Sequence, residues 1–182
     1  MARKESISRN GLLDAAFTMV KEDGAGSITA RKLAAKANCS TQPIFRIFKS
    51  MEEMEKELFL IAITFFDEFF LAFTKKSDVP FVHLGMAYIQ FALDNNNVFA
   101  LLFTSNQRHG KTLYDLINGE AGAVSKEIGK AKADGCKDAG DLFMKMWMVI
   151  HGSACMSLTG DYDLNEADTQ KLLEDSYAAF KA

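Results

Sequence analysis

The sequence contains few of the patterns that mark β-sheets, membrane spans or secreted proteins. It has only two prolines, and no segment alternates polar and β-branched residues over the length of a strand, so an all-α fold is favoured. No stretch reaches the roughly 20 apolar residues of a membrane span, and the N-terminus lacks the apolar core of a secretory signal. We therefore expect a cytoplasmic protein that has no membrane partner.

Residues for covalent or metal chemistry are also scarce. The three cysteines, Cys39, Cys136 and Cys155, lie far apart and show no metal-ligand spacing. We interpret them as free thiols in a reducing compartment, with redox sensing as the alternative. No Ser/His/Asp, Cys/His or paired-carboxylate set can be placed on one face. The sequence thus predicts neither a metal nor a cofactor, and it gives no support for catalysis.

The net charge of -3 conceals two regions of opposite sign. Residues 1–50 hold nine Lys/Arg and four Asp/Glu, a net charge of +5, whereas residues 51–182 hold 12 and 20, a net charge of -8. A basic N-terminal region joined to an acidic body suggests that the first fifty residues meet a polyanion. We predict two domains that divide the chain at this point.

The first domain is predicted to contain three short helices. Apolar residues spaced three and four apart indicate the first helix over residues 6–22. Thr29 can cap the second helix, and Ser40 can cap the third, over residues 41–48, where Pro43 in the first turn costs no hydrogen bond. Two short helices joined by a tight turn and braced by a preceding helix form a helix-turn-helix, which in its DNA-binding versions reads bases with the start of its last helix.

A helical body is predicted to follow. A long helix runs from Ser50 to about Lys76, and Ser50 with Glu53 forms a capping box at its start. Further helices are expected at residues 79–94, 96–104, 109–118, 120–133, 139–159 and 166–181. The last two are the best candidates for an antiparallel pair.

With these elements in place, the segment SITARKLAAKANCSTQPIFRIFKSMEEM resembles the DNA-binding signature of the tetracycline-repressor (TetR) family. The matching residues are Thr29, Arg31, Leu33, Ala34, Ala37, Ser40, Ile44, Phe45, Phe48, Glu52 and Met54. The resemblance is specific over residues 6–54 and general beyond them. It implies a three-helix DNA-binding domain on a helical domain that binds a small molecule and dimerises through its last two helices.

Three positions depart from the family pattern. Phe45 stands where the family has a tyrosine and Met51 where it has a lysine, so two usual phosphate contacts are missing. Fewer phosphate contacts should weaken DNA binding and flatten its salt dependence. Asn38 replaces a glycine in the turn, which asparagine tolerates because it adopts positive φ more readily than other residues.

The candidate DNA contacts follow from the docking geometry that the resemblance implies. We assign the contacts with the bases to Ser40, Thr41, Gln42 and Arg46. Gln42 and Arg46 are the best candidates, because their side chains can make bidentate contacts with adenine and guanine. We assign the contacts with the DNA backbone to Thr29, Arg31, Lys32, Phe45 and Lys49. The alternative for each residue is a solvated helix face.

Aromatic and thioether side chains predict an apolar cavity in the second domain. Ten of the 15 phenylalanines lie between Phe59 and Phe103. We assign the pocket to Phe66, Phe70, Phe91, Phe103, Met144, Trp147, Met148 and His151, and expect a lipophilic or aromatic effector. For any one of them, packing in the core or in a dimer interface is the alternative.

Together these features predict an all-α regulator with a DNA-binding domain at residues 1–50 and a ligand-binding and dimerisation domain at residues 51–182. It would be a homodimeric repressor that a small molecule releases from a palindromic operator. Two alternatives remain: a helical carrier of small molecules that does not use DNA, and an enzyme built on a helical bundle.

Overall fold

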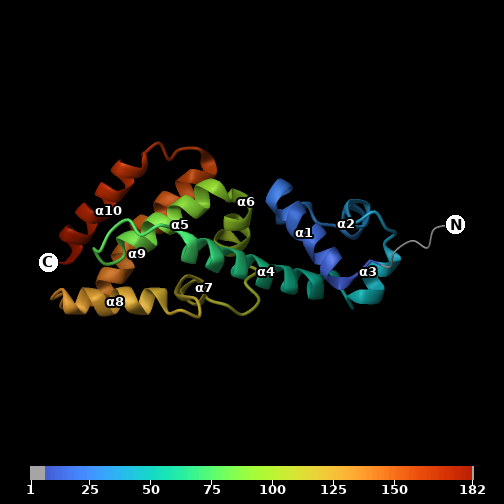
Figure 1. The fold of residues 1–182 in the computed structure, drawn as a ribbon, viewed down its shortest axis with the longest axis horizontal. Helices are drawn as coiled ribbons and strands as arrows, with labels where there is room; N and C mark the ends of the chain where they lie inside the picture. The colour runs from blue at the N-terminus through green and yellow to red at the C-terminus, as the bar shows by residue number, and fades with distance from the viewer. Residues whose placement is uncertain (1–6, 182) are drawn as a thin grey trace. The chain divides into compact units, whose positions relative to one another are not determined.

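The computed structural model describes residues 7–181, and the regular elements of this part of the chain are all helical (Figure 1). The all-α prediction is confirmed. The chain divides into two compact units: the first comprises Met1–Phe65 and Asn97–His109, and the second Phe66–Asn96 and Gly110–Ala182. No helix within the described part of the chain has both the length and the apolar character needed to cross a membrane.

Helix α1 (Arg9–Asp23) opens the first unit. Ser8 caps it, because its hydroxyl accepts a hydrogen bond from the Gly11 amide at 3.0 Å. The predicted start at residue 6 lies outside the described residues, and within them the helix begins at Arg9. Gly24 ends α1 with a φ of 80°, a conformation that glycine adopts without strain.

The two short helices of the predicted helix-turn-helix are present. Helix α2 (Ala30–Lys36) is capped by Thr29, whose hydroxyl accepts a hydrogen bond from the Lys32 amide at 3.2 Å. In the turn that follows, Asn38 has a φ of 51°, which confirms the left-handed conformation expected there.

Helix α3 (Gln42–Ile47) is the last helix of the motif. Pro43 lies in its first turn, as predicted. The predicted cap is wrong: Thr41 rather than Ser40 occupies the N-cap position, and no side chain makes a capping hydrogen bond. The start of α3 therefore keeps unsatisfied backbone donors, which is the property that favours an anion at this position.

Helix α4 (Met51–Ala72) contributes residues to both units. The Ser50 hydroxyl accepts a hydrogen bond from the Glu53 amide at 3.1 Å, as predicted. The reciprocal bond of the capping box does not form, because the Glu53 carboxylate accepts from the Lys49 amide at 2.8 Å instead. The helix ends at Ala72, before the predicted end near Lys76. The predicted boundary after residue 50 coincides with the start of α4, and its division of DNA binding from ligand binding stays a prediction.

The segment that completes the first unit joins two kinds of helix. Helix α6 (Asn96–Phe99) continues into a π-helical turn, η2 (Ala100–Thr104), closed by a hydrogen bond from the Ser105 amide to the Ala100 carbonyl at 3.0 Å. The predicted helix over residues 96–104 therefore has the correct extent, with a wider last turn than an α-helix.

The second unit is built around α5 (Val82–Asp94), which lies beside α9 (Ala139–Thr159) and α10 (Glu166–Lys181) (Figure 1). Gly85 allows this close packing, since a Cβ atom there would lie 2.9 Å from side-chain carbons of both Ile150 and Leu173. The bounds of α9 and α10 agree with the predictions.

The remaining helices of the second unit are α7 (Leu113–Asn118) and α8 (Ala123–Ala133). They and α5 begin three or four residues later than predicted. The late start of α5 has a visible cause: the Phe81 amide donates a hydrogen bond to the buried Glu127 carboxylate at 2.7 Å, and Phe81 adopts a φ of 65°. Glu127 also pairs with Lys130 at 2.6 Å, so the buried charge is compensated.

Candidate nucleic-acid interface and ligand region

The predicted base-contacting residues lie on one exposed edge. The side chains of Ser40, Gln42 and Arg46 are exposed, and Thr41 is half-buried. No hydrogen bond or ion pair engages these four side chains within residues 7–181. On the opposite side of α3, Ile44 is fully buried, and Phe48, the residue after the helix, is 1% exposed. These two apolar contacts fix the helix while leaving its polar edge accessible.

Exposed cations lie on α2 and just after α3. Arg31, Lys32 and Lys49, which are predicted backbone contacts, are exposed, and no carboxylate pairs with their side chains or with Arg46 in the described structure. Lys36 differs, since it forms an ion pair with Glu22 at 2.5 Å. Uncompensated cations next to the start of a helix attract phosphate groups.

The other two predicted backbone contacts are uncharged. Thr29 is exposed and its hydroxyl caps α2, but that hydroxyl can still donate a hydrogen bond, for example to a phosphate oxygen. Phe45 is 55% exposed, which is unusual for a phenylalanine. Its ring can supply apolar contact with a sugar or a thymine methyl group, but no hydrogen bond.

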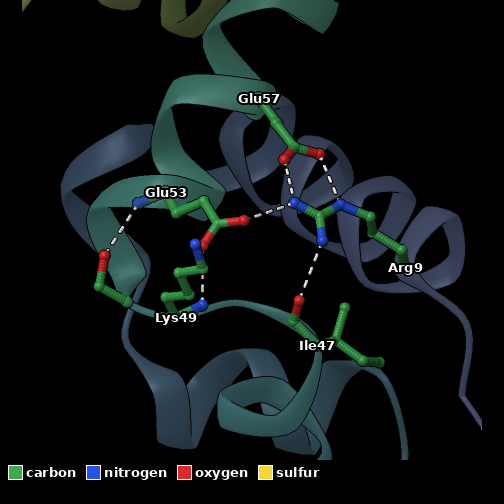
Figure 2. Close-up of polar contacts among 6 residues, drawn as sticks. Arg9, Ile47, Lys49, Glu53 and Glu57 are labelled. Atoms are coloured by element: carbon green, nitrogen blue, oxygen red, sulfur yellow. Dashed lines mark hydrogen bonds and ion pairs between the residues drawn. The ribbon is translucent and has the colours of Figure 1, made fainter.

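Arg9 makes a network that the sequence did not predict (Figure 2). Its guanidinium donates to the Glu57 carboxylate at 2.9 Å from Nε, to Glu53 at 2.8 Å, and to the Ile47 carbonyl at 2.9 Å. Its Cζ atom lies 4.4 Å from the centre of the Phe48 ring. Arg9 thus joins the start of α1, the end of α3 and the first turns of α4.

The pKa shifts of Arg9, Glu53 and Glu57 agree with this geometry. The hydrogen bonds from Arg9 lower the pKa values of Glu57 and Glu53 below their usual range, and the two carboxylates raise the pKa of Arg9 in turn. All three groups therefore stay charged at neutral pH. The acid-rich start of α4 was the available signal, but acidic residues there also suit the helix dipole, so they do not point to a distant arginine.

In the second unit, Tyr88 connects several predicted pocket residues. Its ring lies 6.2 Å from Phe66 and 5.0 Å from Trp147, and its hydroxyl is 3.0 Å from Nδ1 of His151. The Trp147 and His151 rings are stacked at 5.2 Å, and Phe66 meets Phe91 edge-on at 5.0 Å. We call these five residues the aromatic cluster. Tyr88 was not predicted, because nothing local distinguishes it from other apolar residues of α5.

Phe70 and Phe103 occupy different surroundings. Phe70 lies 6.5 Å from Phe66, at the border of the aromatic cluster, and 5.7 Å from the His83 ring. Burial lowers the pKa of His83, so this imidazole favours its neutral form. Phe103 belongs to the first unit, where its ring packs against Phe99 at 5.1 Å.

The structure does not bring Met144 and Met148 into the aromatic cluster. Their side chains are 47% and 65% exposed, and Met156 on the same helix is 48% exposed. Spacings of four and eight residues place all three on one side of α9. In the described chain, no group of three or more His, Cys, Asp or Glu side chains is arranged to hold a metal ion.

A family model described as the C-terminal domain of tetracycline-repressor-like proteins matches residues 81–180, more than half of the chain. This match lies outside the helix-turn-helix, so it is independent of the signature in residues 29–54. Comparison with curated protein sequences found no relative.

Several solved structures are similar over nearly the whole chain. One is a protein of unknown function from Rhodococcus sp. RHA1, with 19% identity, a TM-score of 0.70 and 100% coverage of both chains. Another is a protein from Vibrio parahaemolyticus described as belonging to the TetR family, with 18% identity, a TM-score of 0.66 and coverage of 94% of this chain and 97% of the other. A third is RolR in complex with resorcinol, with 15% identity, a TM-score of 0.54 and coverage of 95% and 85%. At these identities the likeness concerns the fold.

Proposed function

The chain belongs to the tetracycline-repressor family, and on that premise we propose that it is a homodimeric repressor released from a palindromic operator by a small aromatic or apolar effector. Family membership makes it a ligand-responsive transcriptional regulator rather than an enzyme. The repressor role, the operator, the dimer and the effector class are the proposed parts.

The observation that carries the proposal is the exposed edge of α3. Gln42 and Arg46 lie on a helix fixed by buried Ile44, and within residues 7–181 their side chains make no hydrogen bond or ion pair. Exposed cations on α2 and just after α3 likewise have no acidic partner among the described residues. Inserted into the major groove, these two side chains could make bidentate contacts with adenine and guanine, while Arg31, Lys32 and Lys49 neutralise phosphates.

Dimerisation would use the last two helices. The exposed methionines Met144, Met148 and Met156 form an apolar stripe on α9 that the single chain leaves in water. Covering this stripe with the same stripe of a second copy would bury it and give the assembly two α3 helices. Two-fold symmetry of the protein then requires a palindromic site.

The effector would bind at the aromatic cluster. Its rings offer apolar contact, and the Tyr88 hydroxyl with the His151 imidazole offers a polar pair that can orient a ligand hydroxyl. RolR, a protein of similar fold, binds resorcinol, an aromatic diol. We extend this ligand class to the present chain: a benzene ring carrying one or two hydroxyl groups.

Release from DNA follows if the effector prefers a conformation of the second unit that disfavours operator binding. Helix α4 has residues in both units and is a continuous element through which such a preference could act. The coupling between effector and operator is then a difference in binding free energy, typically about 1 to 3 kcal/mol.

Selection of bound fragments from the genomic DNA of the source organism tests the DNA part of the proposal. We expect enrichment of one palindromic sequence, and binding of random DNA that weakens steeply as salt rises. A protein that binds no DNA even at low salt would instead support the carrier alternative.

Trp147 provides the test of the effector part, because it is the single tryptophan of the chain and lies in the aromatic cluster. Phenols should change its fluorescence and lower operator affinity in the same concentration range. Tyr88→Phe, which keeps the ring and removes the hydroxyl, should weaken phenol binding more than toluene binding. Equal effects on both ligands would remove Tyr88 from the ligand contacts.

A further inference from the structure

A cavity of about 560 Å³ lies within the first unit. Its walls come from three segments: the connection from α1 to α2 at Gly24–Ile28, the side chains of Glu55 and Leu58 on α4, and parts of residues 97–109. Neither α3 nor the aromatic cluster contributes to it. The volume is within the range of small-molecule sites.

Irregular backbone surrounds this cavity on two sides. On one side, Gly24 has a φ of 80° and the next three residues form a 3₁₀ turn, η1 (Ala25–Ser27). On the other side lie the π-helical turn η2 and His109, whose φ is 49°. Single π turns and left-handed residues other than glycine are uncommon and are found frequently at functional sites. Here they occur in two of the three segments that line the cavity.

Several polar groups in its walls present hydrogen-bond acceptors. Glu55 is half-buried, and no cation pairs with its carboxylate in the described chain. The Asn97 amide nitrogen donates to the Lys21 carbonyl at 3.0 Å, which leaves its side-chain oxygen as the group able to meet a ligand. The Thr104 hydroxyl donates to the Ala100 carbonyl at 3.0 Å, so it too presents lone pairs.

The helix end at this cavity adds negative potential. Leu101, Thr104 and Ser105 line the cavity at the C-terminal end of η2. The last carbonyl groups of a helix lack intrahelical donors, and the helix dipole makes this end negative. Among the described residues, no lysine or arginine lines the cavity, and His109 is the single basic residue in its walls. An anion would therefore meet one carboxylate, a negative helix end and little positive charge.

Apolar side chains form the rest of the walls: Ile28, Leu58 and Leu101. We propose that this cavity is a binding site for a protonated primary amine with an apolar body. The ammonium group would donate hydrogen bonds to the Glu55 carboxylate and the Asn97 side-chain oxygen, and the apolar body would pack against the three aliphatic side chains. This site is separate from the effector region proposed above and does not depend on DNA binding.

Titration calorimetry with hexylammonium tests this site in the full-length protein, without DNA. Wild type should bind hexylammonium and bind 1-hexanol, which lacks the charge, at least about tenfold more weakly, because hydrogen bonds between charged partners are roughly twice as strong as neutral ones. Glu55→Gln, which keeps the shape of the side chain, should remove this preference. Glu68→Gln changes an exposed carboxylate elsewhere on α4 and should leave binding unchanged.

The position of the ligand requires a second measurement. In methyl-labelled protein, hexylammonium should shift the methyl resonances of Ile28, Leu58 and Leu101 and leave those of Ile150 and Leu173, in the second unit, in place. Absence of binding at millimolar amine, equal affinity for hexanol, or shifts confined to Ile150 and Leu173 would each overturn the assignment. Because no DNA is present, none of these results would decide the repressor proposal.

Discussion

The edge of α3 and the aromatic cluster differ in how much of their bonding capacity the folded chain already uses. At the edge, Gln42 and Arg46 make no hydrogen bond or ion pair within the described residues. In the cluster, Tyr88 is 1% exposed, its ring lies near those of Phe66, Trp147 and His151, and its hydroxyl is hydrogen-bonded to His151. Substitutions at the edge should therefore change binding without changing stability, whereas substitutions in the cluster should change stability first.

The largest expected effect is a loss of stability in the cluster. Phe91 is fully buried, so Phe91→Ala should lower the free energy of unfolding by about 3 to 5 kcal/mol through lost burial and a residual cavity. Leu93→Ala, two residues away on the same helix and 42% exposed, should cost far less. Denaturant unfolding compares the two variants. Equal losses would mean that the cluster is not packed as described.

The next largest expected effect is a loss of sequence specificity at the edge of α3. Gln42→Ala and Arg46→Ala should each weaken operator binding by about 1 to 3 kcal/mol, relax the preference at particular base pairs, and leave the unfolding midpoint unchanged. Random DNA is the control, since a base contact contributes little to binding there. If affinity for operator and random DNA fell equally, both residues would have to be reassigned to the DNA backbone.

The contrast between the two regions also explains what the sequence could predict. The helix-turn-helix is specified by neighbouring residues: the Thr29 cap, Pro43 in the first turn of α3, and Asn38 at positive φ all act within a few positions. The bounds of α10 were predictable for the same reason, because Asn165 accepts a hydrogen bond from the Asp168 amide at 3.0 Å.

Long-range contacts account for what the sequence did not predict. Arg9 and Glu57 are separated by 48 positions, and nothing local indicates that they meet. Helix α9 is apolar around most of its circumference, so its pattern could not decide that Met144 and Met148 face solvent in the single chain while Met146 is buried. The apolar pattern of α5 likewise could not show that Tyr88 lies among the predicted pocket residues.

A substitution at Arg9 should disturb the placement of the α3 edge without changing any residue of that edge. Arg9→Lys keeps the charge, but one ammonium cannot bond two carboxylates and the Ile47 carbonyl in the same planar geometry. We therefore expect faster exchange of the Phe48 amide with solvent. Operator binding should weaken less than in the Gln42 and Arg46 variants, because the residues that contact DNA remain and only their placement becomes less fixed.

Two substitutions on the first turn of α4 provide a test of the Arg9 network and its control. Glu53→Gln removes the charge of a carboxylate that Arg9 contacts, and Glu52→Gln removes that of its exposed neighbour. Glu53→Gln should reproduce the effect of Arg9→Lys on exchange at Phe48, and Glu52→Gln should not. If the two glutamine variants behaved alike, the network would have no part in holding α3.

The smallest expected effect concerns one phosphate contact. Lys49→Ala should weaken binding to operator and random DNA alike and reduce the slope of log affinity against log salt by about 0.9, the contribution of one neutralised phosphate. Lys56→Ala removes an exposed lysine from α4 that is outside the proposed interface, so its slope should match wild type. A slope that Lys49→Ala leaves unchanged would confine the phosphate contacts to Arg31 and Lys32. The proposed interface would then lie closer to α2 than to the end of α3.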